Sequence, residues 1–373
     1  MRSIAVLRIL ALCLASLPAR AWQVNDHLAV DTAMHSFVQY GNYSHAIDGD
    51  GKRLHDKTGA VGILDLATEL RPAPTDELYA RARFVKGNGL NKFEGEAHAP
   101  YGGDLHDDVK DINGSNRDYL LEAWYRHSFR LASDTRLAAS AGIIDSTRYI
   151  DENAYANDPD SQFMNEVFSN NNLPSFPSYS GGGALELESG HWSLHAVYMR
   201  LKNDQDRNYN YHAGQLGYRL STRLGEGNYR LFGFLTNNRF DNARGNRANK
   251  RLNGFGVSVD QQLGDTWGVF LRGGHQGNDA AVEFDRQFSF GVNVNGRLWQ
   301  WPQDEFGLAW SWLGGTDTSK FDDTRVAEAY VRFQLIDHAD LSFDLQYEKD
   351  SMAGHRDRDP SLWVVGTRIN AWF

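Results

Sequence analysis

The chain has 373 residues, with 38 Lys and Arg against 48 Asp and Glu and a formal net charge of −10. This acidic balance argues against a nucleic-acid-binding protein, because binding phosphates requires a basic surface. The 10 Trp, 16 Tyr and 20 Phe make the chain too aromatic to be disordered.

The chain begins with a segment typical of export signals. Two arginines surround the start of an apolar run, and Ala19-Arg20-Ala21 forms an A-x-A cleavage pattern. We therefore expect residues 1–21 to be a signal peptide and residues 22–373 to form a single barrel domain. The only cysteine, Cys13, and three arginines would leave with the signal, which would change the net charge from −10 to −13. An exported chain of this kind would have no disulfide and no cysteine–metal site.

The rest of the chain contains segments about ten residues long in which apolar residues tend to occupy every second position. In residues 339–348 the apolar members are Leu341, Phe343, Leu345 and Tyr347. A period of two predicts strands, because successive side chains leave opposite faces of an extended chain. We predict sixteen strands, at about 30–40, 59–70, 76–86, 118–131, 135–146, 179–188, 191–202, 211–222, 227–238, 252–263, 265–275, 287–297, 305–313, 325–336, 339–349 and 361–373.

The connections between these strands alternate between long and short. Residues 87–117 and 147–178 are long connections, whereas 132–134 and 337–338 are short ones. Up-and-down membrane barrels have tight periplasmic turns at one end and longer extracellular loops at the other. We therefore predict an all-β fold, a transmembrane antiparallel up-and-down β-barrel of about 16 strands. A soluble β-sandwich or propeller is the alternative, although neither has a reason to alternate its loop lengths.

The last predicted strand, SLWVVGTRINAWF, ends on Phe373, which shares a face with Trp363, Val365, Ile369 and Ala371. This ending resembles the signal by which outer-membrane proteins are recognised for barrel insertion. We therefore expect the barrel-assembly machinery and outer-membrane lipid as partners, and the bacterial outer membrane as the location. A closed barrel needs only one apolar strand face, and this accounts for a mean hydropathy as low as −0.54.

The third long connection, residues 147–178, combines six asparagines and five acidic residues with a few apolar side chains. Asp158-Pro159 could start a short helix over 161–168, with Phe163, Met164 and Val167 as its apolar stripe. Such a segment has apolar residues to pack and amides to present. It either folds into the barrel and narrows the pore or remains an ordinary external loop.

This stretch resembles the carbohydrate-selective porin family, the OprB-like porins. The resemblance is good over about 135–200 and elsewhere extends only to architecture. It implies an outer-membrane barrel permeable to monosaccharides, in which inward loops and charges in the lumen constrict the pore. The motifs that carry the resemblance are A-G-I-I-D (Ala141–Asp145), D-E-N-A-Y-A-N-D-P (Asp151–Pro159), Q-F-M-N (Gln162–Asn165) and Y-S-G-G-G-A-L-E-L (Tyr179–Leu187).

Strand alternation also nominates residues that line the lumen. On 118–131 we expect Leu121 and Ala123 to face lipid and Glu122 to face inward. An arginine on the lipid face near the midplane costs about 2–4 kcal/mol, which favours the lumen for arginines. Rings such as Tyr79 and Trp124 could stack on sugars. The candidate lining residues of the strands and the third loop are Glu77, Tyr79, Arg81, Arg83, Glu122, Trp124, Arg126, Arg130, Asp151, Asn153, Asp158, Asn165, Glu328, Arg332 and Arg368.

Signals of catalysis and metal binding are weak. The chain has no G-x-S-x-G or P-loop motif, and His127 and Ser128 fall on opposite strand faces, so we expect no enzyme. His98 and His106 lie near three aspartates but lack helical spacing, so we expect no metal and no cofactor.

The sequence therefore predicts an outer-membrane porin, a passive diffusion channel for small hydrophilic solutes, with sugars as the expected class. Two alternatives remain open at this point. The acidic composition is also compatible with a general or cation-preferring porin, and a barrel could instead form a sheath around a protein partner.

Overall fold

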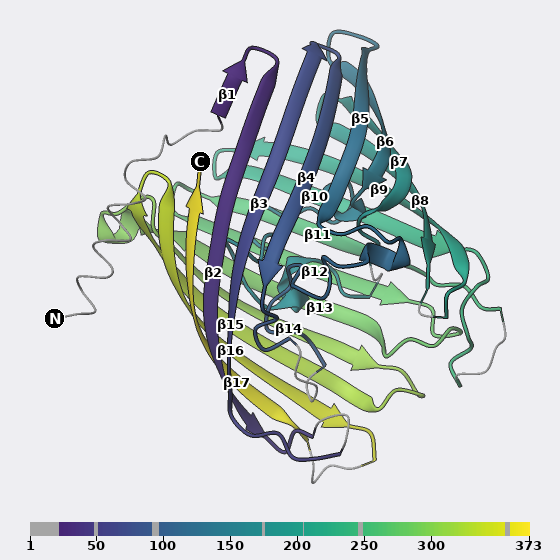
Figure 1. The fold of residues 1–373 in the computed structure, drawn as a ribbon, viewed down its shortest axis with the longest axis vertical. Helices are drawn as coiled ribbons and strands as arrows, with labels where there is room; N and C mark the ends of the chain where they lie inside the picture. The colour runs from purple at the N-terminus through teal and green to yellow at the C-terminus, as the bar shows by residue number, and fades with distance from the viewer. Residues whose placement is uncertain are drawn as a thin grey trace.

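A computed structural model describes residues 22–47, 51–91, 97–173, 176–203, 205–244, 249–354 and 359–373. The predicted signal peptide, residues 1–21, lies outside the described residues. Figure 1 shows long strands that curve around a central space. The strands are β1 (Trp22–Asn25), β2 (Leu28–Ser44), β3 (Lys57–Ala73), β4 (Asp76–Lys86), β5 (Leu120–Arg130), β6 (Thr135–Ile144), β7 (Ser180–Ser189), β8 (Trp192–Lys202), β9 (Asn208–Thr222), β10 (Gly225–Thr236), β11 (Asn253–Leu263), β12 (Trp267–Gln276), β13 (Phe284–Asn295), β14 (Glu305–Gly315), β15 (Phe321–Ile336), β16 (Ala339–Met352) and β17 (Ser361–Trp372).

The sheet closes on itself as an antiparallel barrel. Each strand from β2 to β17 pairs with its sequence neighbours, and β17 pairs with β2 from Ser361↔Ser44 to Trp372↔Ala33. The short strand β1 pairs with the start of β2 as an extra hairpin. The prediction of a sixteen-strand barrel is thus confirmed, with β1 as an addition. Closure gives every strand two partners, which a bilayer requires because lipid cannot satisfy backbone hydrogen bonds.

The outward face of the barrel is apolar. Leu194, Leu231, Phe290 and Val365 are each about half exposed although they lie within strands. Aromatic pairs lie near both ends of the barrel. The ring centroids of Trp192 and Tyr218 are 4.6 Å apart near the short turn between β7 and β8, and those of Tyr347 and Trp363 are 4.6 Å apart near the longer connection between β16 and β17. An apolar band between aromatic rings is the outer surface that a membrane barrel presents to lipid. In the part of the chain that the structure describes, no helix is long and apolar enough to cross a bilayer.

Two long connections fold into the barrel and lie across its centre in Figure 1. The second loop, residues 87–119, buries Leu90, Tyr101 and Val109. The third loop, residues 145–179, buries Phe163, Met164, Val167 and Phe168. Both loops therefore pack their apolar side chains inside the lumen against inward-facing residues of the wall, and the inward alternative predicted for the third loop is confirmed.

The helix in the third loop is shorter than predicted. Only α2 (Glu166–Ser169) is helical, after a 3-10 turn at Ser146–Arg148, and residues 158–165 are irregular. The reason is that the backbone N–H groups of Met164 and Asn165 donate to the carboxylate of Glu328 on the barrel wall, at 2.5 and 2.9 Å. A helix over 161–168 would use those N–H groups internally.

The lipid-facing position predicted for Leu121 is wrong. The register shifts beside it, because Arg81 pairs with Glu122 whereas Ala82 pairs with Leu120. This bulge turns Leu121 inward, where it is fully buried against the second loop. An extra residue in one strand displaces side chains from strict alternation, and alternation alone does not reveal it.

Candidate functional site

The third loop is attached to the barrel wall on several sides. Asp151 and Arg272 of β12 form a fully buried ion pair, with Nε 3.2 Å from Oδ2, and Arg272 also donates to the carbonyl oxygen of Phe168 at 2.6 Å. Arg368 of β17 donates to the carbonyl oxygens of Pro159 and Gln162 at 2.6 and 3.1 Å. The loop is therefore fixed across the lumen rather than free to move out of it.

The second loop is attached to the wall as well, in part through carboxylates of β16. The backbone N–H of Ala97 donates to Glu348 at 2.8 Å and to Asp350 at 3.0 Å, and both acceptors lie on β16. The two loops meet where the N–H of Gly102 donates to the carbonyl oxygen of Met164 at 2.7 Å. Together they form a continuous layer inside the barrel.

A charged cluster ties the third loop to strands β2, β3 and β4. Arg83 donates through Nη2 to Asp65 at 2.6 Å and to Asp160 at 2.7 Å, and Tyr101 of the second loop donates to Asp160 as well. Burial alone would raise the pKa of Asp160, but the charges of Arg83 and His35 lower it well below its ordinary value. The Asp160 carboxylate is therefore ionised at any physiological pH.

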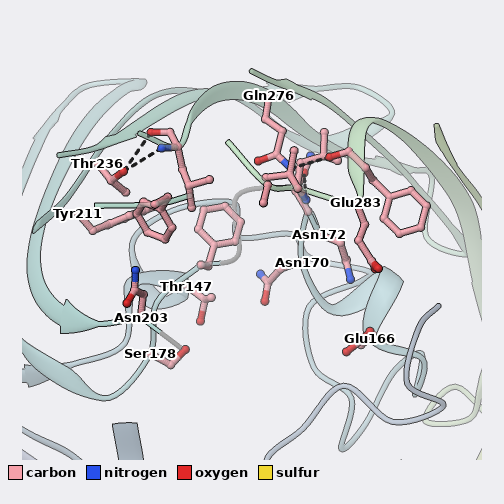
Figure 2. Close-up of a pocket in the computed structure, with 18 of the residues that line it drawn as sticks. Thr147, Glu166, Asn170, Asn172, Ser178, Asn203, Tyr211, Thr236, Gln276 and Glu283 are labelled. Atoms are coloured by element: carbon pink, nitrogen blue, oxygen red, sulfur yellow. Dashed lines mark hydrogen bonds between the residues drawn. The ribbon is translucent and has the colours of Figure 1, made fainter. Parts of the chain in front are cut away.

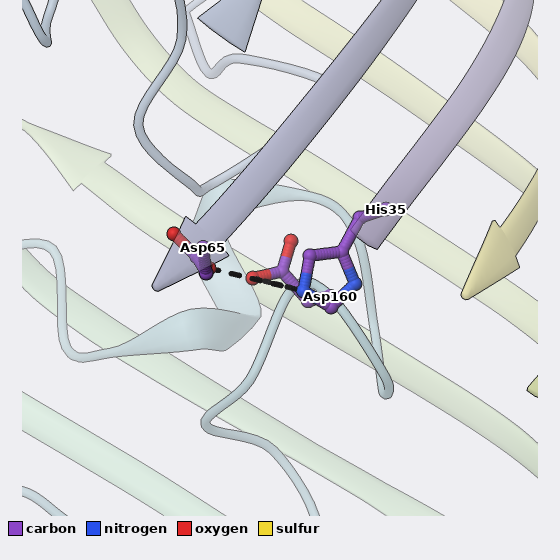
Figure 3. Close-up of side chains that lie close together, drawn as sticks. All are labelled: His35, Asp65 and Asp160. Carbon is purple, nitrogen blue, oxygen red and sulfur yellow. Dashed lines mark ion pairs between the residues drawn. The ribbon is translucent and has the colours of Figure 1, made fainter. Parts of the chain in front are cut away.

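His35, Asp65 and Asp160 point toward one another in Figure 3 and offer ligand atoms within 4.8 Å. His35 Nε2 lies 3.8 Å from Asp65 and 3.9 Å from Asp160, while its Nδ1 lies 3.0 Å from Asn370. A His and two carboxylates can bind a divalent cation. Here Arg83 pairs with both carboxylates and Arg81 pairs with Asp65 at 3.0 Å, so the cluster is an ion-pair network.

Next to this cluster, on β4 and the adjacent strand β5, a second arginine covers two stacked rings. Tyr79 and Trp124 have ring centroids 5.0 Å apart, and Cζ of Arg148 lies 4.8 Å from the centroid of Tyr79. Arg148 also forms a bidentate pair with Glu122, at 2.8 and 3.0 Å. Burial opposes its charge, but Glu122 more than compensates and raises the pKa of Arg148. The arrangement presents a fixed guanidinium to the lumen.

The turn that carries Arg148 depends on two residues of the A-G-I-I-D motif. At Gly142, with φ +147°, a Cβ would lie 2.3 Å from the carbonyl oxygen of Ala123, so only glycine allows this approach of β5 and β6. Asp145 accepts hydrogen bonds from N and Oγ1 of Thr147 at 2.9 and 2.8 Å. Burial, and then the charge of Glu122, raise the pKa of Asp145 to about 6.

Three cavities run through the barrel and share lining residues. The outer vestibule, of about 740 Å³, lies among the long loops, and Figure 2 shows its polar side chains. It shares five residues with a central cavity of about 440 Å³, and this junction ring consists of Gly102, Thr147, Ser169, Asn170 and Ser178. The central cavity shares Arg81, Asp158 and Asp160 with an inner mouth of about 400 Å³ that reaches Phe373. The cavities therefore lie end to end.

The predicted lining residues fall into three groups. The first lies at the central cavity, where Arg81, Arg83, Glu122 and Asp158 line it and Tyr79 and Trp124 lie beneath Arg148. The second attaches the third loop to the wall and comprises Asp151, Asn153, Asn165, Glu328 and Arg368. The third lies away from the three cavities and comprises Glu77, Arg126, which pairs with Glu186, Arg332, which pairs with Glu305, and the exposed Arg130 at the end of β5.

Several residues of the site were not nominated from the sequence. Asp145, Arg148 and Asp160 lie in the third loop, and nothing in their spacing distinguishes them from its other charged residues. The inward course of the second loop left a clearer signal. Its apolar residues Leu90, Leu105, Val109 and Ile112 interrupt an acidic segment, and an external loop would have to expose them.

A closed barrel of sixteen long strands with an apolar outside, an internal layer of loops and a polar passage is an outer-membrane porin. The model of the carbohydrate-selective porin family, OprB, matches residues 73–373, and the chain belongs to this family. The protein is therefore a porin of the bacterial outer membrane.

The chain is also similar to individual proteins over most of its length. A protein of Aquifex aeolicus (strain VF5), described as uncharacterized, is 28% identical over 298 residues, which cover 79% of this chain and 82% of the relative. The high-pH structure of Pseudomonas putida OprB superposes with a TM-score of 0.73 at 14% identity, over 94% of this chain and 95% of that one. The Pseudomonas aeruginosa OccK2 (OpdF) structure in complex with glucuronate gives a TM-score of 0.54 at 9% identity, over 93% and 98% of the two chains. The two structures support the fold.

Proposed function

We propose that this porin conducts small neutral sugars by passive diffusion through the three cavities, with the central cavity as the selective part. The observation that carries the proposal is the end-to-end arrangement of the cavities through the junction ring and past Arg81, Asp158 and Asp160. A sugar hydroxyl needs both donors and acceptors, and this wall offers guanidinium groups and carboxylates close together. No covalent step is involved.

The central residues would act through two kinds of contact. Arg81 and Arg148 are partly exposed, with side-chain exposures of 26% and 38%, so both can donate to hydroxyl groups. Asp158 can accept hydrogen bonds from the facing side. Tyr79 and Trp124 would not stack on sugar directly, because Arg148 covers them; they would hold the guanidinium in place. Weak contacts of this kind admit a solute and still release it.

A cation-preferring channel is the second candidate function. Carboxylates outnumber arginines among the lining residues of the central cavity, where Asp104, Asp145 and Glu152 add to the residues already named. A protein-filled sheath is less well supported, because the chain's own two loops occupy the lumen. For assembly, we propose that Phe373 and the strand before it are the part that the barrel-assembly machinery recognises.

Liposome swelling with a panel of sugars and salts would test the proposal. We expect glucose to enter liposomes that contain the porin, and we expect glucose to reduce ion current through porin in a planar bilayer. Salt currents unaffected by glucose, together with a strong cation preference in reversal potentials, would favour the second candidate. Absence of any conductance would contradict both.

A further inference from the structure

The outer vestibule holds an unusual set of polar atoms. Five buried side-chain atoms that line it have no hydrogen-bond partner among the residues that the structure describes. They are Nε2 of His98, Oγ of Ser169, Nδ2 of Asn170, Oδ1 of Asn172 and the hydroxyl of Tyr211. His98, Ser169 and Tyr211 are themselves at least nine-tenths buried. A buried polar atom is costly unless water or a ligand satisfies it, so these atoms are prepared for a polar guest.

The same cavity also offers apolar surfaces for a guest. Phe176 packs on Phe232 with ring centroids 5.5 Å apart, and Tyr209 packs edge-on against Phe240 at 5.0 Å. Phe284 lies 5.5 Å from the ring of His98. Phe176, Tyr209, Phe240 and Phe284 all line the vestibule. A sugar has hydroxyl edges and apolar C–H faces, and a cavity with both unpartnered polar atoms and aromatic rings matches that chemistry. Its volume of about 740 Å³ lies within the range of small-molecule sites, about 300–1,000 Å³.

The charged residues that line the vestibule limit the class of sugar that it can bind. Three carboxylates, Glu166, Asp241 and Glu283, line the vestibule, against one ammonium group, that of Lys202. Lys202 is itself paired with Asp206 at 2.9 Å. Asp241 is likewise paired with Arg207 at 2.8 Å, and Glu283 lies 3.7 Å from Lys320. These residues therefore offer no unpaired cation to a uronate, whereas a neutral sugar needs none.

We propose that the outer vestibule is a docking site for a neutral saccharide, separate from the central cavity and loaded before it. The inference rests on the proposed function for its solute class. It assigns His98, Ser169, Asn170, Asn172 and Tyr211 as the groups that bind hydroxyls. Ser169 and Asn170 also belong to the junction ring, so the docked solute already touches the entrance to the central cavity.

Cysteine protection tests occupancy of the vestibule directly, because the chain has no cysteine after Cys13. Ala281→Cys places a thiol on the exposed margin of the vestibule. We expect glucose to slow its reaction with a thiol reagent, about twofold at a concentration equal to Kd. Thr318→Cys, exposed in the turn between β14 and β15, is the matched control and should react at the same rate with or without glucose. Glucuronate should protect Ala281→Cys less than glucose does.

Removing a single hydroxyl group tests whether the assigned side chains bind the sugar. Tyr211→Phe removes the unpartnered hydroxyl and keeps the buried ring, and we expect about 3- to 10-fold weaker protection by glucose. Tyr198→Phe on the neighbouring strand removes a hydroxyl on the lipid face, which contacts Asn210 at 3.3 Å, and should have no effect. Ser169→Ala removes a second assigned hydroxyl group, and it should also weaken protection by glucose.

The outcomes separate this inference from the proposed function. If glucose crosses liposomes but neither protects Ala281→Cys nor responds to Tyr211→Phe and Ser169→Ala, the docking site is wrong and the sugar channel stands. If glucose protects Ala281→Cys but does not cross, the docking site stands and the channel proposal fails. Equal protection by glucuronate would overturn the preference for neutral sugars.

Discussion

Arg83 of β4 and Asp160 of the third loop lie with Nη2 and Oδ2 2.7 Å apart, and both side chains are buried. The same guanidinium donates to Asp65 on β3, so one arginine joins two wall strands to the loop that crosses the lumen. This contact acts together with Asp151–Arg272 and the hydrogen bonds of Arg368 to hold the third loop in the lumen.

Arg83→Ala should loosen the third loop and destabilise the barrel. Removing one partner of a buried ion pair leaves uncompensated charge and costs about 3–5 kcal/mol. We expect a lower free energy of unfolding in urea and a larger, noisier single-channel conductance. Arg71→Ala, which removes an exposed arginine paired with Glu69, is the control and should change neither quantity. Unchanged conductance in Arg83→Ala would mean that the other wall contacts hold the loop alone.

Acid should not release this contact. The pKa of Asp160 is lowered, so its contribution to stability is present above the ordinary pKa of 3.8 and is lost only as pH falls through the much lower folded value. We therefore expect the single-channel conductance of wild type and of Asp160→Asn to differ by the same factor at pH 7 and at pH 4.5. Convergence of the two conductances at pH 4.5 would show that Asp160 is protonated there and that its pKa has been misjudged.

Asp145 should behave in the opposite way. Burial and the charge of Glu122 raise its pKa to about 6, so its folding contribution is present below the ordinary value of 3.8 and is lost as pH rises through about 6. Above that pH the central cavity gains a negative charge. We expect the cation preference, measured as a reversal potential in a KCl gradient, to increase between pH 5 and pH 7. Asp145→Asn keeps an acceptor for Thr147 and should abolish this step, whereas Asp134→Asn in a short turn should preserve it.

Arg148→Gln should shift selectivity toward cations. A unit charge about 8 Å from a passing ion in a water-like dielectric contributes about 0.5 kcal/mol, with opposite sign for a cation and an anion, so the cation-to-anion permeability ratio should rise about fivefold. Blockade of current by glucose should weaken, because a donor is lost above Tyr79. Arg136→Gln at the barrel rim, where Arg136 pairs loosely with Glu188 at 3.8 Å, serves as the control. Equal effects of the two substitutions would mean that Arg148 does not contribute to the selectivity of the pore.

Gly102→Ala tests the junction ring. A Cβ at Gly102 would lie 2.5 Å from Oγ of Ser169 and 2.7 Å from Cα of Glu166, so one added carbon must push the two loops apart or into the passage. We expect altered single-channel conductance with little change in the amount of folded porin. Gly181→Ala, where a Cβ meets nothing within 4 Å, should leave conductance unchanged. A wild-type conductance in Gly102→Ala would show that the junction ring accommodates the added carbon without a change in the passage.

The strands were predictable from sequence because their determinant is local. Alternating side chains must meet lipid and lumen in turn, so all sixteen predicted segments overlap an observed strand. Alternation predicted the wrong side for a residue that packs against a loop inside the barrel. Leu121 faces inward because the second loop offers it an apolar partner beside a bulge.

The attachment of the loops could not be predicted in the same way. Asp160 is paired with Arg83, 77 residues away, and Asp151 with Arg272, 121 residues away. Nothing local in the sequence distinguishes a carboxylate that anchors a loop from one that lines a pore. Glu328 shows the point, since its inward position follows from alternation but its acceptance of two loop N–H groups follows from the closed barrel.

Leu231→Arg tests which face of the barrel meets lipid. Leu231 lies in the middle of β10 and is 53% exposed on the outer face, so an arginine there would enter the apolar part of the bilayer. We expect the free energy of unfolding from lipid vesicles to fall by about 2–4 kcal/mol. Leu224→Arg makes the same change in the short turn between β9 and β10, where the side chain is 59% exposed, and should cost less than about 0.5 kcal/mol because the charge stays in water. The ratio of the two effects is the informative quantity, since a barrel with its apolar face toward water would tolerate both arginines equally.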